Sequence, residues 1–368
     1  MLRRCAVFLT LLVLTLARTG VCAGPADSEA MAFSRKMGIG WNLGNTLEAT
    51  GINGSSVREF ETCWGNPVTT REMFDGIKAA GFKSVRIPVA WSNLIAADHT
   101  IDKDLMARVE AVAKYALDND LYVIINIHWD GGWIKKFSTD YEGTLMKYKM
   151  IWRQIAERFK DHSDHLIFES MNEEGCFDDL WNRWGGEPAQ KDKAFEILNN
   201  VNLEFVNLVR ASGNNAQRYL LIAGYATDIA CTVDPAFKMP KDPVNRSMVS
   251  VHYYDPSTFT LLEKDADWGK AAHTWGTDAD VAKVKADMLK VQQRFIDQGI
   301  PVVLGEFGCS SKKDPASTHQ YLTTVCETAY SLGIVPMLWD IGEIYDRRTC
   351  KLKNPELGRV LARIAATP

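Results

Sequence analysis

Residues 166–173 read Leu-Ile-Phe-Glu-Ser-Met-Asn-Glu. The stretch begins as a short apolar run with a β-branched and an aromatic residue, which is typical of a buried strand. It ends in Asn172 and Glu173, two polar side chains that follow the expected end of the strand. Because burying an unpaired polar or charged group costs free energy, polar residues at this place indicate a chemical role.

Similar short runs recur along the chain, separated by segments with helical spacing. The eight candidate strands are residues 38–41, 84–87, 122–125, 166–169, 219–222, 248–251, 301–304 and 334–337. Between them, apolar residues recur every three or four positions, as in the segment from Val281 to Phe295, whose pattern stops at Gly299. Eightfold alternation predicts parallel strands, in either a closed (β/α)8 barrel or a doubly wound open sheet.

The positions of the candidate functional side chains favour the barrel. They lie at or just past the ends of every candidate strand except the fifth: Asn42, Arg86, His128, Asn172, Glu173, His252, Glu306 and Trp339. In an open sheet, ligand-binding groups gather at one switch point, whereas in a barrel they come from nearly every strand and meet at one rim. The sequence therefore predicts an α/β fold, a single (β/α)8 TIM barrel over residues 24–368 without an appended module.

The first 23 residues differ from the rest of the chain. Arg3 and Arg4 precede an apolar stretch over residues 6–17, and Val21-Cys22-Ala23 follows. This pattern predicts a secretory signal peptide, cut after Ala23. The alternative, a membrane anchor, needs about 20 apolar residues, which is more than this run provides. We therefore expect a secreted, extracellular protein that has no membrane association after cleavage. We also expect a monomer.

Composition limits the possible partners. The chain has 368 residues, of which 46% are hydrophobic and 24% are charged, with a formal net charge of −4. This charge excludes a nucleic-acid partner bound by bulk phosphate neutralisation, which needs an excess of Lys and Arg. In an oxidising compartment we expect disulfides among six cysteines, with 15 possible pairings that the sequence cannot choose between: Cys63, Cys176, Cys231, Cys309, Cys326 and Cys350.

Two carboxylates carry the candidate chemistry. Glu173 follows the fourth strand and Glu306 the seventh, and two carboxyl groups across a sugar-sized cleft are the minimum apparatus for hydrolysing a glycosidic bond. Either glutamate alone fits a salt bridge or a helix cap equally well, but Arg86, His128 and His252 on the same rim favour catalysis. Nine tryptophans at strand ends or in the following loops suit stacking on sugar rings, and we expect about half of them to contact ligand: Trp41, Trp91, Trp129, Trp133, Trp181, Trp184, Trp268, Trp275 and Trp339.

Over essentially the whole chain after residue 23, the sequence resembles glycoside hydrolase family 5, the cellulase A type. The matching stretches are residues 40–46 (Gly-Trp-Asn-Leu-Gly-Asn-Thr), 85–89 (Val-Arg-Ile-Pro-Val), 127–129 (Ile-His-Trp), 172–173 (Asn-Glu), 252–254 (His-Tyr-Tyr), 305–308 (Gly-Glu-Phe-Gly) and 338–340 (Leu-Trp-Asp). The resemblance implies an endo-acting β-glycanase with Glu173 as acid/base and Glu306 as nucleophile. In the family the acid/base motif commonly continues as Asn-Glu-Pro, but here Glu174 follows, which makes Glu174 a rival for Glu173.

The resemblance also implies the supporting residues. Active-site support is expected from Arg86, His128, Asn172, His252 and Tyr254, and substrate binding from Trp339, Asn45, Trp129 and Trp133. Physically, Arg86 should keep Glu306 ionised, while the negative charge of Glu306 should raise the pKa of Glu173 so that it stays protonated. We expect no cofactor and no metal in this chemistry.

These expectations describe a secreted endo-β-1,4-glucanase that binds a β-glucan polysaccharide and acts by a retaining double displacement. The same mechanism on xyloglucan, mixed-linkage glucan, mannan or xylan is the alternative, because the sequence does not give the conformation of the loops that discriminate among these polymers. A metal-dependent barrel hydrolase is a rival enzyme, and a catalytically silent carbohydrate-binding barrel is the alternative from another class.

Overall fold

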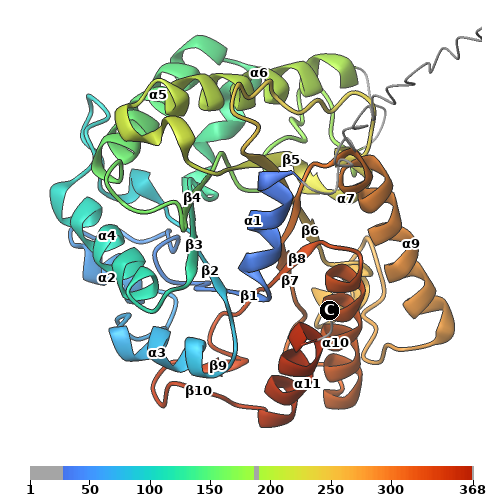
Figure 1. The fold of residues 1–368 in the computed structure, drawn as a ribbon. Helices are drawn as coiled ribbons and strands as arrows, with labels where there is room; N and C mark the ends of the chain where they lie inside the picture. The colour runs from blue at the N-terminus through green and yellow to red at the C-terminus, as the bar shows by residue number, and fades with distance from the viewer. Residues whose placement is uncertain (1–27, 186–189, 367–368) are drawn as a thin grey trace, which may run out of the picture.

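Eight parallel strands form a closed barrel in chain order, with β1 paired to both β2 and β8 (Figure 1). The computed structural model describes residues 28–185 and 190–366. The strands are β1 (Gly40–Asn42), β2 (Ser84–Ile87), β3 (Tyr122–Asn126), β4 (Leu166–Glu169), β5 (Leu220–Asp228), β6 (Ser247–Tyr253), β7 (Val302–Phe307) and β8 (Val335–Leu338). The predicted (β/α)8 barrel is confirmed, and each of its strands overlaps a predicted one.

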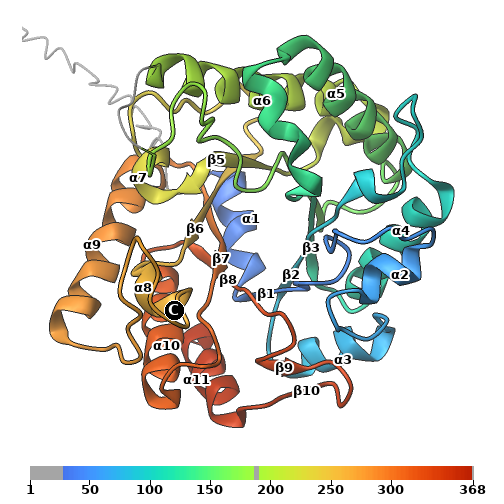
Figure 2. The same cartoon turned by 180° about the vertical axis from the view of Figure 1, so that it is seen from behind.

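Helices surround the barrel on its outer side (Figures 1 and 2). The α-helices after β1 are α2 (Val57–Thr62), α3 (Arg71–Ala79), α4 (Lys103–Leu117), α5 (Tyr141–Arg158), α6 (Lys191–Arg210), α7 (Ile229–Thr232), α8 (Ser257–Thr260), α9 (Asp278–Arg294), α10 (Pro315–Ser331) and α11 (Pro355–Ala366). Short 3-10 helices are η2 (Trp91–Leu94), η3 (Asp130–Ser138), η4 (Gly213–Gln217) and η5 (Ile296–Gln298), and a small hairpin pairs β9 (Tyr345–Asp346) with β10 (Lys351–Leu352). No described helix is long and apolar enough to cross a membrane. The predicted signal peptide lies outside the described residues.

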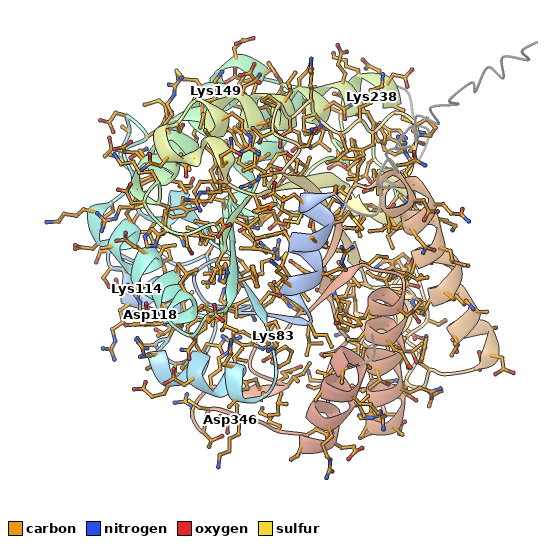
Figure 3. The ribbon with its side chains drawn as sticks, viewed as in Figure 1. Lys83, Lys114, Asp118, Lys149, Lys238 and Asp346 are labelled. Atoms are coloured by element: carbon orange, nitrogen blue, oxygen red, sulfur yellow. The ribbon has the colours of Figure 1, made fainter. Side chains whose placement is uncertain are left out.

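The helices pack through the apolar faces that their spacing predicts. In α4, Leu105, Val109, Val112 and Ala116 are buried, while Lys114 and Asp118 form an ion pair at its exposed side (Figure 3). In α9 the buried face runs from Val284 to Val291 and continues to Phe295 just after the helix. Val281 was predicted on that face, but it lies in the first turn after the cap and is 36% exposed. The buried face of α9 therefore begins at Val284, three residues later than predicted.

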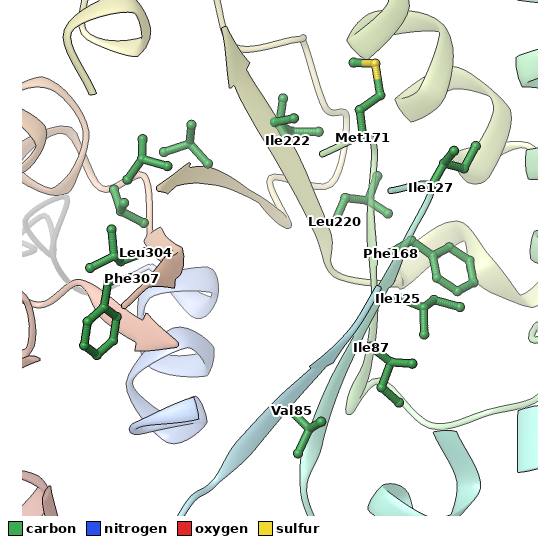
Figure 4. Close-up of a cluster of buried hydrophobic side chains, with 14 of the residues drawn as sticks. Val85, Ile87, Ile125, Ile127, Phe168, Met171, Leu220, Ile222, Leu304 and Phe307 are labelled. Atoms are coloured by element: carbon green, nitrogen blue, oxygen red, sulfur yellow. The ribbon is translucent and has the colours of Figure 1, made fainter. Parts of the chain in front are cut away.

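The core has two parts, because strand residues point alternately outward and inward. Outward residues such as Val85, Ile87 and Phe168 pack against the helices (Figure 4). Inward residues near the start of the strands, including Ile124 and Ile167, pack under α1 (Glu29–Met37), which lies in front of the barrel centre in Figure 1.

Two residues further along β3 and β4, the inward positions hold Asn126 and Glu169, both fully buried. The interior is therefore apolar at the end closed by α1. It is polar at the opposite end.

The predicted disulfides are wrong. All six cysteines after residue 23 are free thiols. They lie on separate elements: Cys63 directly follows α2, Cys231 is in α7, Cys326 is in α10, and Cys350 directly precedes β10. A disulfide needs two Cα atoms about 4.4–6.8 Å apart, and the number of cysteines in a sequence carries no information about that distance.

Candidate active site

Arg86 of β2 is the centre of the site. It is fully buried, and its guanidinium donates hydrogen bonds to four side chains. The acceptors are Glu169 Oε2 at 2.6 Å, Glu306 Oε1 at 2.7 Å, Asn172 Oδ1 at 2.7 Å and Asn42 Oδ1 at 3.2 Å. Burial alone would lower the pKa of Arg86, but the carboxylates of Glu169 and Glu306 raise it above its ordinary value. Arg86 is therefore a fixed positive charge that holds residues from β1, β4 and β7 together.

Glu306, in β7, receives a second hydrogen bond from the rim. Tyr254 donates its hydroxyl to Glu306 Oε2 at 2.8 Å, while Arg86 binds the other oxygen. Burial raises the pKa of Glu306, and the neighbouring Glu173 adds to this effect. His252, Arg86 and the Tyr254 hydroxyl act in the opposite direction. The two donors fix the orientation of this carboxylate and favour its ionised form.

Glu173 lies in the loop after β4 and faces Glu306 across a short gap. One carboxylate oxygen of each glutamate and a ring nitrogen of His252 all lie within 4.8 Å of one another. His252 Nδ1 is 2.8 Å from Glu173 Oε1 and 3.7 Å from Glu306 Oε2. The side chain of Glu173 is 46% exposed to the cleft, yet the protein around its carboxyl removes enough water to raise its pKa to about 7. Burial is thus the main cause of the raised pKa of Glu173, whereas the sequence analysis predicted the charge of Glu306 as the cause.

Two histidines border the carboxylates in neutral form. Burial, together with the charge of Arg86, lowers the pKa of His252 to about 4, although the carboxylates of Glu306 and Glu169 act in the opposite direction. Burial also holds the pKa of His128 well below its ordinary value, with Arg86 and His252 adding to the effect. The ring of His128 is parallel to the indole of Trp339, with 5.9 Å between the ring centroids. Neither histidine adds positive charge to the site near neutral pH.

The carboxylates open into a cleft of about 1090 Å³. The loops after β4 and β6 contribute to its walls, which include Cys176, Arg183, Trp184, Asp255 and Trp268. A smaller cavity of about 380 Å³ adjoins it, and three residues line both spaces: Tyr254, Leu261 and Trp339. A cleft of this size accommodates several units of a polymer, as a buried single-sugar pocket would not.

Seven of the nine tryptophans fall into two groups. Trp41, Trp91, Trp181 and Trp275 are buried and belong to the core, as does Trp152 of α5. Trp184 is 67% exposed and Trp268 is 62% exposed, and together with Trp339 they line the cleft.

Three predicted substrate-binding residues line neither cavity. Trp129 is 49% exposed on the surface. Trp133 is half-buried and donates its indole N–H to Asp130 at 2.6 Å, and Asn45 binds Glu48 through its main chain. Their contribution to substrate binding stays a prediction.

Sequence reasoning missed several residues of the site. Glu169 reads as the last residue of an ordinary strand, although its position two residues after inward-facing Ile167 indicates that it faces the interior. The fifth strand was predicted to end at Ile222 without a functional residue, but β5 continues to Asp228 through an irregular register. Asp228 lines the cleft and pairs with Arg183 at 2.9 Å.

Glu174, the rival of Glu173, does not line the cleft among the residues described. It is buried, and its carbonyl oxygen accepts a hydrogen bond from Ala226 N at 2.7 Å. Burial raises the pKa of Glu174 to about 8, which Lys135 partly offsets and Glu173 reinforces. The structure thus places Glu173 at the cleft and Glu174 behind it.

Glu173, His252 and Glu306 are also the group of described residues whose ligand atoms are close enough to hold a metal ion. An ion there would have to replace existing hydrogen bonds, because His252 binds Glu173 and Tyr254 binds Glu306. Carboxylate and imidazole donors suit zinc, but these same atoms are engaged with one another in this arrangement.

Comparison with known proteins identifies the family. A family model described as cellulase (glycosyl hydrolase family 5) matches residues 47–343. Endoglucanase B of Clostridium cellulovorans is 39% identical over 332 residues, covering 89% of this chain and 70% of that protein. A xyloglucan-specific endo-β-1,4-glucanase of Bacteroides ovatus is 38% identical over 356 residues, covering 90% of this chain and 69% of that protein.

A solved structure shows the same architecture. It is a broad-specificity endoglucanase of family 5, subfamily 4, from an uncultured bovine rumen ciliate, and it matches with a TM-score of 0.83 and 32% identity. The match covers 92% of this chain and 98% of that one. The chain therefore belongs to the cellulase family of glycoside hydrolases, family 5, and is a glycoside hydrolase of the endo-1,4-β-glucanase kind.

Proposed function

We propose that this enzyme cleaves internal β-1,4 bonds of a glucan chain with retention of configuration, using Glu306 as nucleophile and Glu173 as acid/base. The observation that carries the proposal is the approach of the two carboxylates to within 4.8 Å in an open cleft. Retaining pairs are about 5–5.5 Å apart, whereas inverting pairs are about 6.5–9.5 Å apart to admit a water molecule. The short separation favours direct attack by a carboxylate.

In the first step, Glu306 attacks the anomeric carbon while Glu173 gives its proton to the leaving oxygen. The pKa of about 7 supports a protonated Glu173 below neutral pH. Once Glu306 forms an ester with the sugar, its negative charge disappears, and Glu173 ionises more readily and activates water. Asn172 Oδ1 accepts a hydrogen bond from Arg86. Asn172 therefore binds the sugar 2-hydroxyl by donating from Nδ2.

For substrate and location we propose a cellulose-type β-glucan cut outside the cell, after removal of residues 1–23. The xyloglucan specificity of the Bacteroides ovatus relative keeps a branched glucan as the second candidate. Product analysis on cellulose, mixed-linkage glucan, xyloglucan, mannan and xylan ranks these polymers. Amino-terminal sequencing of protein from the culture medium, expected to begin at Gly24, tests secretion.

Replacement of each glutamate tests the mechanism. Glu306→Ala should abolish turnover of every substrate, because no covalent intermediate forms without the nucleophile. Glu173→Ala should still be glycosylated by an activated aryl glycoside, whose leaving group departs without protonation, and the intermediate should then persist. Azide, which needs no deprotonation, should enter the space left by Glu173, restore turnover and yield a β-glycosyl azide.

Glu174→Ala is the matched control. It should retain activity on unactivated polysaccharide and should gain nothing from azide. A β-glycosyl azide from Glu306→Ala would show that the roles of the two carboxylates are reversed, because azide in the place of the nucleophile displaces the leaving group only once and gives the α-azide. Azide rescue confined to Glu174→Ala would show that Glu174 is the acid/base.

A further inference from the structure

Glu169 is a second carboxylate on Arg86. It is the last residue of β4, faces the barrel interior and is fully buried. Its carboxylate accepts hydrogen bonds from Arg86 Nε at 2.6 Å, from Asn126 Nδ2 at 3.0 Å and from Ser250 Oγ at 2.8 Å. Arg86 and the Asn126 amide can only donate at these atoms, so the arrangement suits an ionised carboxylate.

The charges around Arg86 do not balance with Glu306 alone. Arg86 supplies one positive charge, whereas Glu169 and Glu306 supply two negative charges when both are ionised. The other titratable groups that face this cluster are His128 of the loop after β3, Glu173 of the loop after β4, His252 of β6 and Tyr254. Burial keeps His128 and His252 neutral and Tyr254 protonated near neutral pH, and a pKa of about 7 keeps Glu173 mostly protonated at slightly acidic pH. With Glu169 and Glu306 ionised, the cluster then carries a net charge of −1 before substrate binds.

We propose that Glu169 is a positioning residue that offsets the charge of Arg86, so that Glu306 remains a reactive nucleophile and Glu173 retains its proton. The inference rests on the roles proposed above for Glu306 and Glu173. Opposed by Arg86 alone, Glu306 would be a more stabilised and weaker nucleophile, and Glu173 would ionise more readily. With Glu169 present, Arg86 orients Glu306 through a hydrogen bond while contributing little net charge to the site.

Glu169→Gln tests this role with little change of shape. The Gln carbonyl oxygen can replace Oε2 as the acceptor from Arg86 and Asn126, and its NH2 group can donate to Ser250, whose hydroxyl rotates to accept. The three hydrogen bonds are kept and only the charge is removed. Loss of a negative charge makes both Glu306 and Glu173 easier to ionise, so both limbs of the pH profile of kcat/KM should move to lower pH, by about one unit.

Ser250→Ala is the matched control, because it removes one hydrogen bond to Glu169 and leaves the charge in place. Its profile should keep both limbs at the wild-type pH, although its melting temperature should fall. Unshifted limbs in a folded Glu169→Gln would overturn the inference, as would equal shifts in the two variants. Activity remaining in Glu306→Ala would instead overturn the proposed mechanism.

If Glu169→Gln does not fold, carboxyl NMR of the wild-type enzyme tests whether Glu169 carries the negative charge that the inference requires. In protein labelled with 13C in its glutamate side chains, the resonance that Ser250→Ala perturbs belongs to Glu169. We expect this resonance to have the chemical shift of an ionised carboxylate at neutral pH, because its three side-chain partners all donate hydrogen bonds to it. The chemical shift of a protonated carboxyl would overturn the inference.

Discussion

Replacing Glu174 by Gln should stabilise the protein at pH 8 and leave catalysis intact. Burial raises the pKa of Glu174 from 4.5 to about 8, and its side chain lies behind the cleft. A carboxyl whose pKa is higher in the folded than in the unfolded chain favours folding only in its protonated form. Its contribution is complete below pH 4.5 and is lost as the pH rises through about 8. Gln is neutral throughout and does not lose this contribution.

The size of the effect follows from the two pKa values. At about 1.36 kcal/mol per pH unit, ionising the carboxyl removes at most about 4 kcal/mol of unfolding free energy by pH 8. For a chain of this length, about 1 kcal/mol corresponds to about 1.4 °C, so the upper limit is a rise of about 6 °C in Tm. Calorimetry of both proteins at pH 5 and pH 8 measures it. Glu142→Gln, which removes an exposed acid from α5, is the control and should show no gain that depends on pH.

An equal change of Tm at both pH values would refute the reasoning, because it would show that the charge of Glu174 is not what destabilises the fold. Activity on unactivated glucan is the second measurement. Its loss in Glu174→Gln, with the fold intact, would mean that Glu174 takes part in proton transfer.

Tyr254→Phe removes a hydrogen bond that favours ionised Glu306, so the pKa of that carboxyl should rise and the acidic limb of kcat/KM should move up by about one pH unit. An unmoved acidic limb in the pH profile would contradict this role. Removal of divalent metals with a chelator should leave turnover unchanged, because the proposed steps use only carboxylates and their hydrogen-bond partners. Activity lost with chelator and regained with zinc would point to an ion at Glu173, His252 and Glu306.

The barrel is readable from the sequence because its decisive signals are local. Each strand is a short apolar run, and a polar residue near or after the end of the run marks the rim, so Arg86, Glu173 and Glu306 stand out by position alone. Glu169 also ends a strand, but its importance depends on sharing Arg86 with Glu306, a contact between residues that are far apart in the chain. The extension of β5 to Asp228 escaped prediction for a related reason. Its register is irregular and lacks the alternation that identifies a strand.

Burial of the tryptophans and pairing of the cysteines depend on packing between distant elements. Trp91 and Trp184 both occur near polar residues in the sequence, yet one is fully buried and the other is 67% exposed. Indole rings suit a hydrophobic core as well as a sugar-binding surface, so residue type alone cannot separate these uses. The number of cysteines likewise gives no distances between them, so the sequence could not show that the six thiols in the described residues form no disulfide.

The division of the barrel interior into an apolar end under α1 and a polar end at the rim has a practical consequence for engineering. Filling or repacking around Phe33, Ile124 and Ile167 is the place to seek heat resistance, since these side chains are remote from the reacting groups. Exchanges at exposed cleft residues such as Trp184 and Trp268, by contrast, can be explored for new linkage preferences at modest risk to folding. A stabilised apolar end would let the enzyme tolerate more destabilising substitutions at the polar end.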